Sequence, residues 1–171
     1  MRALAPAVIL FASHFAALGV DAVSIRGTVR TADKHRGEVV RVGRNSVQSG
    51  VRDQFLDIEL RAVAPSAATN VRVSWLVLVE PPRGRPPHVA ARGMALTNLS
   101  RTAAAEVETE TFAMPEREVQ HRGKVAEVDS KVSAWAVRVE DDRGQLLMER
   151  VEPEREAATI HELWQPKRPG R

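Results

Sequence analysis

The chain contains no cysteine and no tyrosine, and its aromatic residues are limited to three Trp and four Phe in 171 residues. The absence of cysteine excludes disulfide bridges, thiolate zinc sites, iron–sulfur clusters and thiol nucleophiles. The scarcity of aromatic rings argues against a carbohydrate-binding module, because such modules stack sugar rings on exposed Trp or Tyr side chains. Stability has to come from ordinary burial, which a chain of this length can supply.

A strong charge of either sign is also absent. The chain has 25 Lys and Arg residues against 22 Asp and Glu residues, a formal net charge of +3. Hydrophobic residues make up 43% and charged residues 27%, as in ordinary globular domains. This balance argues against wholesale disorder and against a dense basic surface for nucleic acid.

The N-terminal segment has the three parts of a signal peptide. Arg2 supplies a positive charge, Ala7 to Leu18 form a mostly apolar run, and Val20 and Ala22 occupy the small positions before a cleavage site. The run is too short to span a bilayer, which takes about twenty residues. The sequence therefore predicts a signal peptide over residues 1–22, with a buried N-terminal helix as the alternative. We expect the mature protein to be exported, periplasmic or secreted, and bacterial.

The mature chain alternates apolar and polar residues with a period of two, which is typical of strands with one buried face. The turn sequence at residues 140–144, Glu-Asp-Asp-Arg-Gly, predicts a hairpin. The predicted fold class is all-β, a two-sheet antiparallel sandwich of about seven strands over residues 23–152. The predicted strands are Val23 to Arg30, Gly37 to Val42, Phe55 to Val63, Val71 to Val79, Ala105 to Phe112, Val132 to Val139 and Gln145 to Val151.

Two other segments have a different character. Residues 81–87 contain four prolines, which predicts a stiff connection rather than a strand. In the C-terminal segment, residues 153–171, the spacing of Ala157, Ile160 and Trp164 predicts a short helix over Glu154 to Leu163, followed by a basic tail.

The predicted strands include one with Trp75 at its centre and one that carries Trp135 into a late hairpin. In this arrangement the chain resembles immunoglobulin-like and fibronectin type III-like sandwiches. The resemblance covers roughly residues 23–152 and implies the architecture alone, because the inter-sheet cysteines and the tyrosine corner of antibody domains are missing. A fold of this type does not by itself choose a function.

Catalytic and metal-binding patterns are weak. Glu106, Glu108 and Glu110 alternate along one predicted strand, where they could shift a pKa or bind calcium, although a solvated face that discourages edge pairing is the favoured interpretation. No nucleophile elbow or phosphate-binding glycine loop is present. We therefore expect no enzyme activity, no cofactor and no metal. The mature histidines lie too far apart in sequence to form a helical metal pair: His35, His88, His121 and His161.

The most informative positions are Leu76 and Leu78, which make the second face of their predicted strand apolar as well. Either the C-terminal helix or the proline-rich connection covers them, which is the favoured reading, or they contact a partner. The candidate partner-contact residues are Leu76, Leu78, Arg83, Arg85 and Arg92, the last three from the predicted loop between residues 83 and 92.

We expect a non-catalytic interaction or structural module in a bacterial envelope or secreted complex, with another protein of that compartment as its partner and no membrane span. The alternative is a binding module for an acidic glycan or another polyanion, through Arg41, Arg44, Arg83 and Arg85. Interleaved acidic residues and the lack of aromatic residues in these clusters argue against nucleic acid. Salt separates the two readings, since a polyanion complex weakens steeply with ionic strength.

Overall fold

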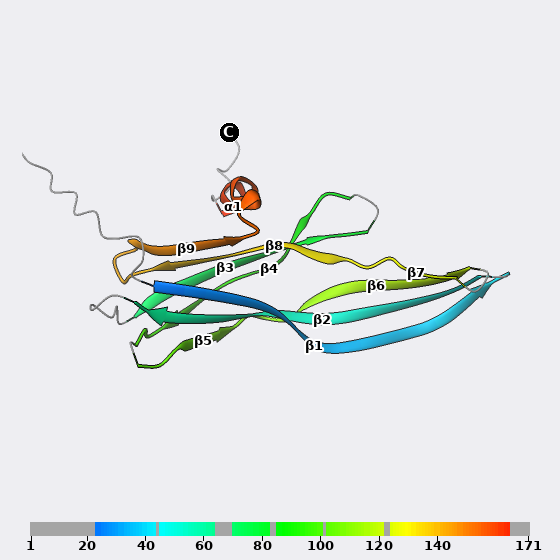
Figure 1. Cartoon of the computed structure of the whole chain (residues 1–171), viewed down its shortest axis with the longest axis horizontal. Helices are drawn as coiled ribbons and strands as arrows, with labels where there is room; N and C mark the ends of the chain where they lie inside the picture. Colours follow the sequence, from blue (N-terminus) through cyan, green and yellow to red (C-terminus); the bar gives the residue numbers. More distant parts are fainter. Residues whose placement is uncertain are drawn as a thin grey trace, which may run out of the picture.

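A computed structural model of the chain describes residues 23–43, 45–63, 70–82, 85–100, 102–121 and 124–164. The described chain folds into two antiparallel β-sheets and one short C-terminal helix (Figure 1). This confirms the predicted fold class. The predicted signal peptide, residues 1–22, and the basic tail, residues 165–171, lie outside the described residues.

The first sheet has five strands in the order β1-β2-β6-β7, with β5 paired to β2 as well. β1 and β2 form one long hairpin that turns at Gly43, where φ is 62°. β2 is long enough to pair with β6 along its first half and with β5 along its second half. The strands are β1 (Val23–Val42), β2 (Asn45–Ala62), β5 (Ala105–Glu108), β6 (Phe112–His121) and β7 (Lys124–Glu127).

The second sheet has four strands in the order β4-β3-β8-β9. The hairpin between β8 and β9 turns where it was predicted, with Gly144 at a φ of 78° and the Asp141 N–H donating to the Gln145 carbonyl at 2.9 Å. A short 3-10 turn (Glu154–Glu156) then leads into α1 (Ala157–Trp164). The strands are β3 (Val71–Glu80), β4 (His88–Thr97), β8 (Lys131–Glu140) and β9 (Leu146–Glu152).

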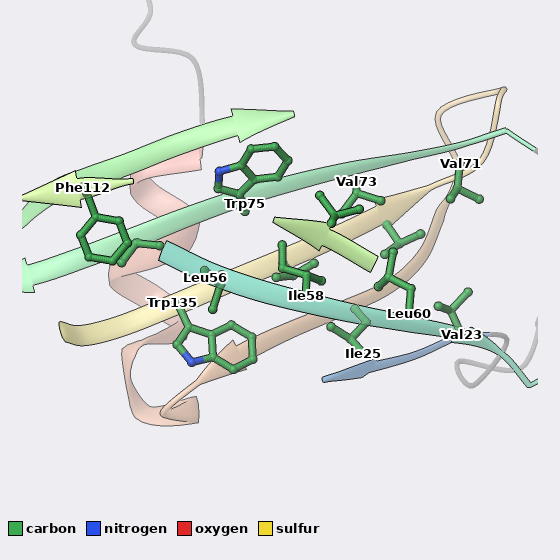
Figure 2. Packing of buried hydrophobic residues seen from close by; sticks show 14 of the residues in the cluster. Val23, Ile25, Leu56, Ile58, Leu60, Val71, Val73, Trp75, Phe112 and Trp135 are labelled. Atoms are coloured by element: carbon green, nitrogen blue, oxygen red, sulfur yellow. The ribbon is translucent and has the colours of Figure 1, made fainter. Parts of the chain in front are cut away.

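The core lies between the two sheets, where alternate residues of β1, β2, β3 and β8 point toward one another (Figure 2). β-branched and aromatic side chains dominate these positions, as expected of strands that pack on a partner sheet. Figure 2 shows Phe112, Trp75 and Trp135 toward one end of this core and Val23 and Val71 toward the other. Both tryptophans are buried.

The described chain has nine strands, so the prediction of about seven is corrected. β1 is continuous where two short strands were predicted, and β6 and β7 were not predicted. β4 begins at His88, inside the segment that was predicted to be a loop as far as Arg92. The apolar alternation that guides prediction reports only strands with one buried face. Much of β1 and β6 has no buried face.

The first sheet continues well past the second one, toward the right in Figure 1. Residues 31–41 of β1 are all exposed, whereas Val23 and Ile25 at the start of the same strand are buried in the core. We name this extension the arm. It consists of residues 33–42 of β1, 45–53 of β2, 113–121 of β6, and β7.

Candidate functional site

The arm presents two faces of different chemistry. Its inner face continues the core side of the sheet, because Gln54 is buried at the end of the core and Arg52 and Gly50 follow at alternate positions of β2. Its outer face carries the intervening residues, among them Val47 and Val51. Toward the tip both faces are open to solvent, since the second sheet does not reach this far (Figure 1), whereas Met114 at the base of the arm is still buried in the core.

A compact ion-pair network occupies the inner face where the arm leaves the sandwich. The Glu116 carboxylate accepts from the Arg52 guanidinium and lies 3.0 Å from Lys34 Nζ. Arg52 also lies 3.5 Å from a carboxylate oxygen of Asp129. The cross-strand register explains the meeting, because Lys34 lies beside Arg52 and Glu116 lies beside Gly50, which has no side chain to obstruct the carboxylate. Two cations from neighbouring strands thereby converge on the Glu116 carboxylate, and Arg52 links it to Asp129.

Burial alone would raise the pKa of the Glu116 carboxyl, but hydrogen bonds and charge from Lys34 and Arg52 outweigh it and hold the pKa below its ordinary value. Glu116 is therefore ionised at neutral pH. The paired carboxylate holds neighbouring strands together through its ion pairs. It has no proton to donate and is therefore unsuited to act as a general acid.

Toward the tip, the inner face is hollowed over a volume of about 420 Å³. The lining is polar and mixed in charge, and includes Arg41, Asn45, Ser46, Gln48, Glu118 and Gln120. Arg41, one of the residues predicted to bind a polyanion, therefore shares its surroundings with a carboxylate. Such a lining suits water and neutral polar groups better than a dense array of negative charge.

The outer face carries an apolar row that crosses all four strands. Val40 lies opposite Val47, Val47 opposite Val119, and Val119 opposite Ala126. Val40 is 57% exposed and Ala126 is exposed, while the two central valines are half-buried by their neighbours. Because a solvated strand face is ordinarily polar, an apolar row in register is a feature that solvent alone does not explain.

Basic residues border this row. Arg117 lies one position nearer the sandwich on the same face, opposite Ser49, and His121 and Lys124 face each other on the tip side. All three side chains are exposed.

The acidic residues Asp33 and Asp53 are paired at the base of the arm, where His35 Nε2 lies 3.3 and 3.6 Å from their carboxylates.

Leu76 and Leu78 lie on the outside of the second sheet, beneath helix α1. Their exposed fractions are 0% and 1%, and they pack with Ile160 in a small second core that also holds Ala134 and Ala136. The internal cover favoured from the sequence is what the structure has. The prediction that these two leucines contact a partner is corrected, because the helix leaves no free surface there.

Helix α1 is fixed to the sheet by polar contacts as well as by Ile160. Arg138 binds Glu149 at 2.6 and 2.8 Å and lies 4.6 Å from the ring centroid of Trp164. His161 hydrogen-bonds the second oxygen of Glu149. Burial alone would raise the pKa of Glu149, but the hydrogen bonds from His161 and Arg138 lower it below its ordinary value.

Those of the remaining predicted site residues that the structure describes do not converge. Arg44 and Arg83 lie outside the described residues. Arg85 is exposed in the connection between β3 and β4, far from the arm tip that carries Arg41 (Figure 1). Arg92 belongs to β4, where its guanidinium donates to the Leu163 carbonyl of α1. The described arginines of the two predicted surfaces, Arg41, Arg85 and Arg92, thus lie on separate parts of the fold.

The row of glutamates divides between two settings. Glu106 and Glu108 lie on the solvent side of β5, beside Glu59 and Asp57 of β2. Those two neighbours are neutralised by arginines, Glu59 by Arg61 at 2.8 Å and Asp57 by Arg30 at 2.7 Å. Glu110 follows in the exposed connection to β6. Over residues 23–164, less the gaps given above, no three His, Asp or Glu side chains are grouped to hold a metal ion.

Comparison with protein-family models, with curated proteins and with solved structures finds no match to this chain. Among the described residues, no helix is both long enough and apolar enough to cross a membrane.

Sequence reasoning missed the arm and its two faces. The signal that was available is the valine pair Val39-Val40 and the isolated Val47 and Val119, which stand among polar residues without a period. Only the strand register shows that three of these four valines share one face.

Proposed function

We propose that this chain is an exported, non-catalytic interaction module of a bacterial envelope or secreted complex, with a two-sheet fold like that of immunoglobulin-like sandwiches. The outer face of the arm is its contact surface. The observation that carries the proposal is the row formed by Val40, Val47, Val119 and Ala126, which crosses four strands on a part of the sheet that no core requires. An extension of this kind buries little of its own surface within the chain. Contact with another molecule would bury its apolar row and stabilise it.

The charges beside the row define the partner. Arg117 on one side and His121 with Lys124 on the other favour a protein surface that has an apolar centre and carboxylates at its border. In such an interface the apolar centre supplies most of the affinity, and the bordering charges set orientation and association rate. The complex should therefore survive high salt, with only a modest loss of affinity.

The polyanion alternative has less support. Its described residues, Arg41 and Arg85, lie on separate parts of the fold, and Arg41 shares its hollow with Glu118 (Figure 1). A polyanion would need several unopposed cations along one surface.

Site-specific crosslinking tests the proposal. A photoreactive amino acid is placed at Val40 or, as a matched control, at Val63, an equally exposed valine at the opposite end of the β1–β2 hairpin. Both proteins are produced in the source cells and irradiated, and the adduct is identified by mass spectrometry. We expect an adduct with one envelope or secreted protein from position 40 and none from position 63.

The identified protein is then purified and titrated calorimetrically against the wild type and two variants. We expect Val40→Asp to weaken binding by at least about tenfold, because it replaces the most exposed valine of the row with a charge, and Val63→Asp to leave it unchanged. A lack of any adduct above the control would overturn the proposal. Binding that disappears in high salt and ignores Val40→Asp would establish the polyanion reading in its place.

A further inference from the structure

Strand β4 forms one edge of the second sheet. β3 pairs with one side of it, and no strand within the described ranges pairs with the other. An unpaired edge offers a row of backbone donors and acceptors to any other strand. Proteins usually protect such edges with charged side chains, prolines, bulges or very short strands.

The other edge strands carry these protections. β1 has two register shifts and cationic residues along its length. β5 and β7 have only four residues each, with Glu or Lys among them. β9 contains Glu149, Arg150 and Glu152, and Arg150 donates to the Ile25 carbonyl at 2.9 Å, which ties this edge to the opposite sheet.

β4 lacks them. It is ten residues long and contains no lysine, acidic residue or proline. Its single arginine, Arg92, is drawn onto helix α1 by the carbonyl of Leu163. The one register shift against β3 falls near its beginning, so the stretch from Arg92 to Thr97 pairs regularly.

Two large apolar side chains project from this regular stretch. Met94 is 60% exposed and Leu96 is 74% exposed, the highest value among the large hydrophobic residues of the described chain. They lie two residues apart and therefore on the same face of the strand. Ala95 between them points the other way and packs against the core.

We propose that β4 pairs antiparallel with β4 of a second copy of this chain, with Ala95 of one copy opposite Ala95 of the other. In this register Met94 of each copy lies opposite Leu96 of the other copy, so four exposed apolar side chains form one cluster. Arg92 lies opposite Asn98, and no two like charges meet. The two four-stranded sheets become one continuous sheet across the two-fold axis.

The second copy is the occupant because the edge is complementary to itself. Met94 and Leu96 are equally distant from Ala95, so a two-fold rotation at Ala95 exchanges them. A strand from an unrelated protein would have to supply its own matching pair of apolar residues. This interface is separate from the arm, so it holds or fails independently of the function proposed above.

Sedimentation equilibrium of the purified protein tests the inference. We expect a dimer, and we expect Leu96→Lys to raise the dimer dissociation constant by at least about tenfold, because it puts charge at the centre of the interface. Leu146→Lys is the matched control, since Leu146 is an exposed leucine on β9, the opposite edge of the same sheet. Circular dichroism confirms that both variants remain folded.

The double variant Met94→Glu/Leu96→Lys tests the register. The introduced glutamate of one copy then faces the introduced lysine of the other, so dimerisation should return at low salt and weaken at high salt. A protein that is monomeric at high concentration would overturn the proposal. So would a dimer that ignores Leu96→Lys, or one that Leu96→Lys dissociates and the double variant fails to restore.

Discussion

The indole ring of Trp135 lies directly over the backbone of Gly27, and this contact joins the two sheets. A Cβ atom added to Gly27 would lie 2.6 Å from Cη2 of the ring, and two other ring atoms would lie within 2.8 Å. Trp75 covers Gly93 of the neighbouring strand in the same way, with the nearest ring atom 2.3 Å from an added Cβ. Each large ring is thus matched to a position that has no side chain.

We therefore expect Gly27→Ala to destabilise the fold by about 1–3 kcal/mol, the usual cost of overpacking a core. Urea unfolding followed by tryptophan fluorescence measures the change in free energy. Thr28→Ala, at the adjacent exposed position, is the control and should change the free energy by less than about 0.5 kcal/mol. Equal stability of the Gly27→Ala variant and the wild type would show that the ring does not rest on the glycine.

Removing the Ile160 side chain tests the cover over Leu76 and Leu78. Ile160 is fully buried in the second core, so Ile160→Ala should cost about 2–5 kcal/mol in the free energy of unfolding and increase the binding of an apolar dye. Thr159→Ala on the exposed side of the same helix should do neither. If the two variants unfold at the same urea concentration, α1 does not hold this cover in solution.

Acid should weaken the fold through Glu116 and Glu149. Both carboxyls have folded-state pKa values below the ordinary value of 4.5, so their contributions to stability are complete above that pH and disappear as pH falls through the folded values. Urea unfolding measured from neutral pH downward should show this loss below pH 4.5. We expect a smaller dependence of the free energy of unfolding on pH in the variants Glu116→Gln and Glu149→Gln, because the carboxylate is then absent at every pH.

The control for this pH series is Glu118→Gln, an exposed carboxyl two residues along the same strand as Glu116. Below pH 4.5 the free energy of unfolding of this variant should depend on pH as it does in the wild type. A slope that responds equally to Glu118→Gln and Glu116→Gln would contradict the assignment to the network with Lys34 and Arg52.

Hydrogen exchange should divide β1 and β2 into two halves. The halves that face the core, such as residues 56–60 of β2, should exchange only through global unfolding. The arm halves of the same two strands, such as residues 45–50, should exchange faster, since they have no packed layer above or below them. Mass spectrometry of exchanged peptides makes the comparison within one molecule, and uniform protection along both strands would contradict it.

The sequence predicts best where one face of a strand is buried. The alternation from Val71 to Val79 places β3 correctly, and Gly144 places the turn after β8, because each depends on neighbours in the chain. The spacing of Ile160 and Trp164 likewise locates the C-terminal helix to within a few residues. These signals are local, so one sequence is enough to show them.

The arm could not be predicted in the same way. Pro115 argues against a strand, and with both faces wet the residues around it have no period to detect. Lys34 lies beside Arg52, and so reaches Glu116, because an irregularity between Thr31 and Asp33 shifts the register of β1 against β2. β4 could not be predicted for another reason. The Trp75 ring leaves room only for glycine at position 93, and small residues such as glycine and alanine are poor indicators of a strand.

The continuity of β2 also fixes the distance between the tip of the arm and the sandwich. β2 runs as one strand from the core at Ile58 to the tip at Asn45, and its pairing with β6 has no register shift, so the tip is held at a set distance from the sandwich. At about 3.3 Å per residue, the nine residues from Asn45 to Asp53 carry the tip about 30 Å beyond the sandwich. A molecule held there would be kept at that spacing from whatever binds the rest of the protein.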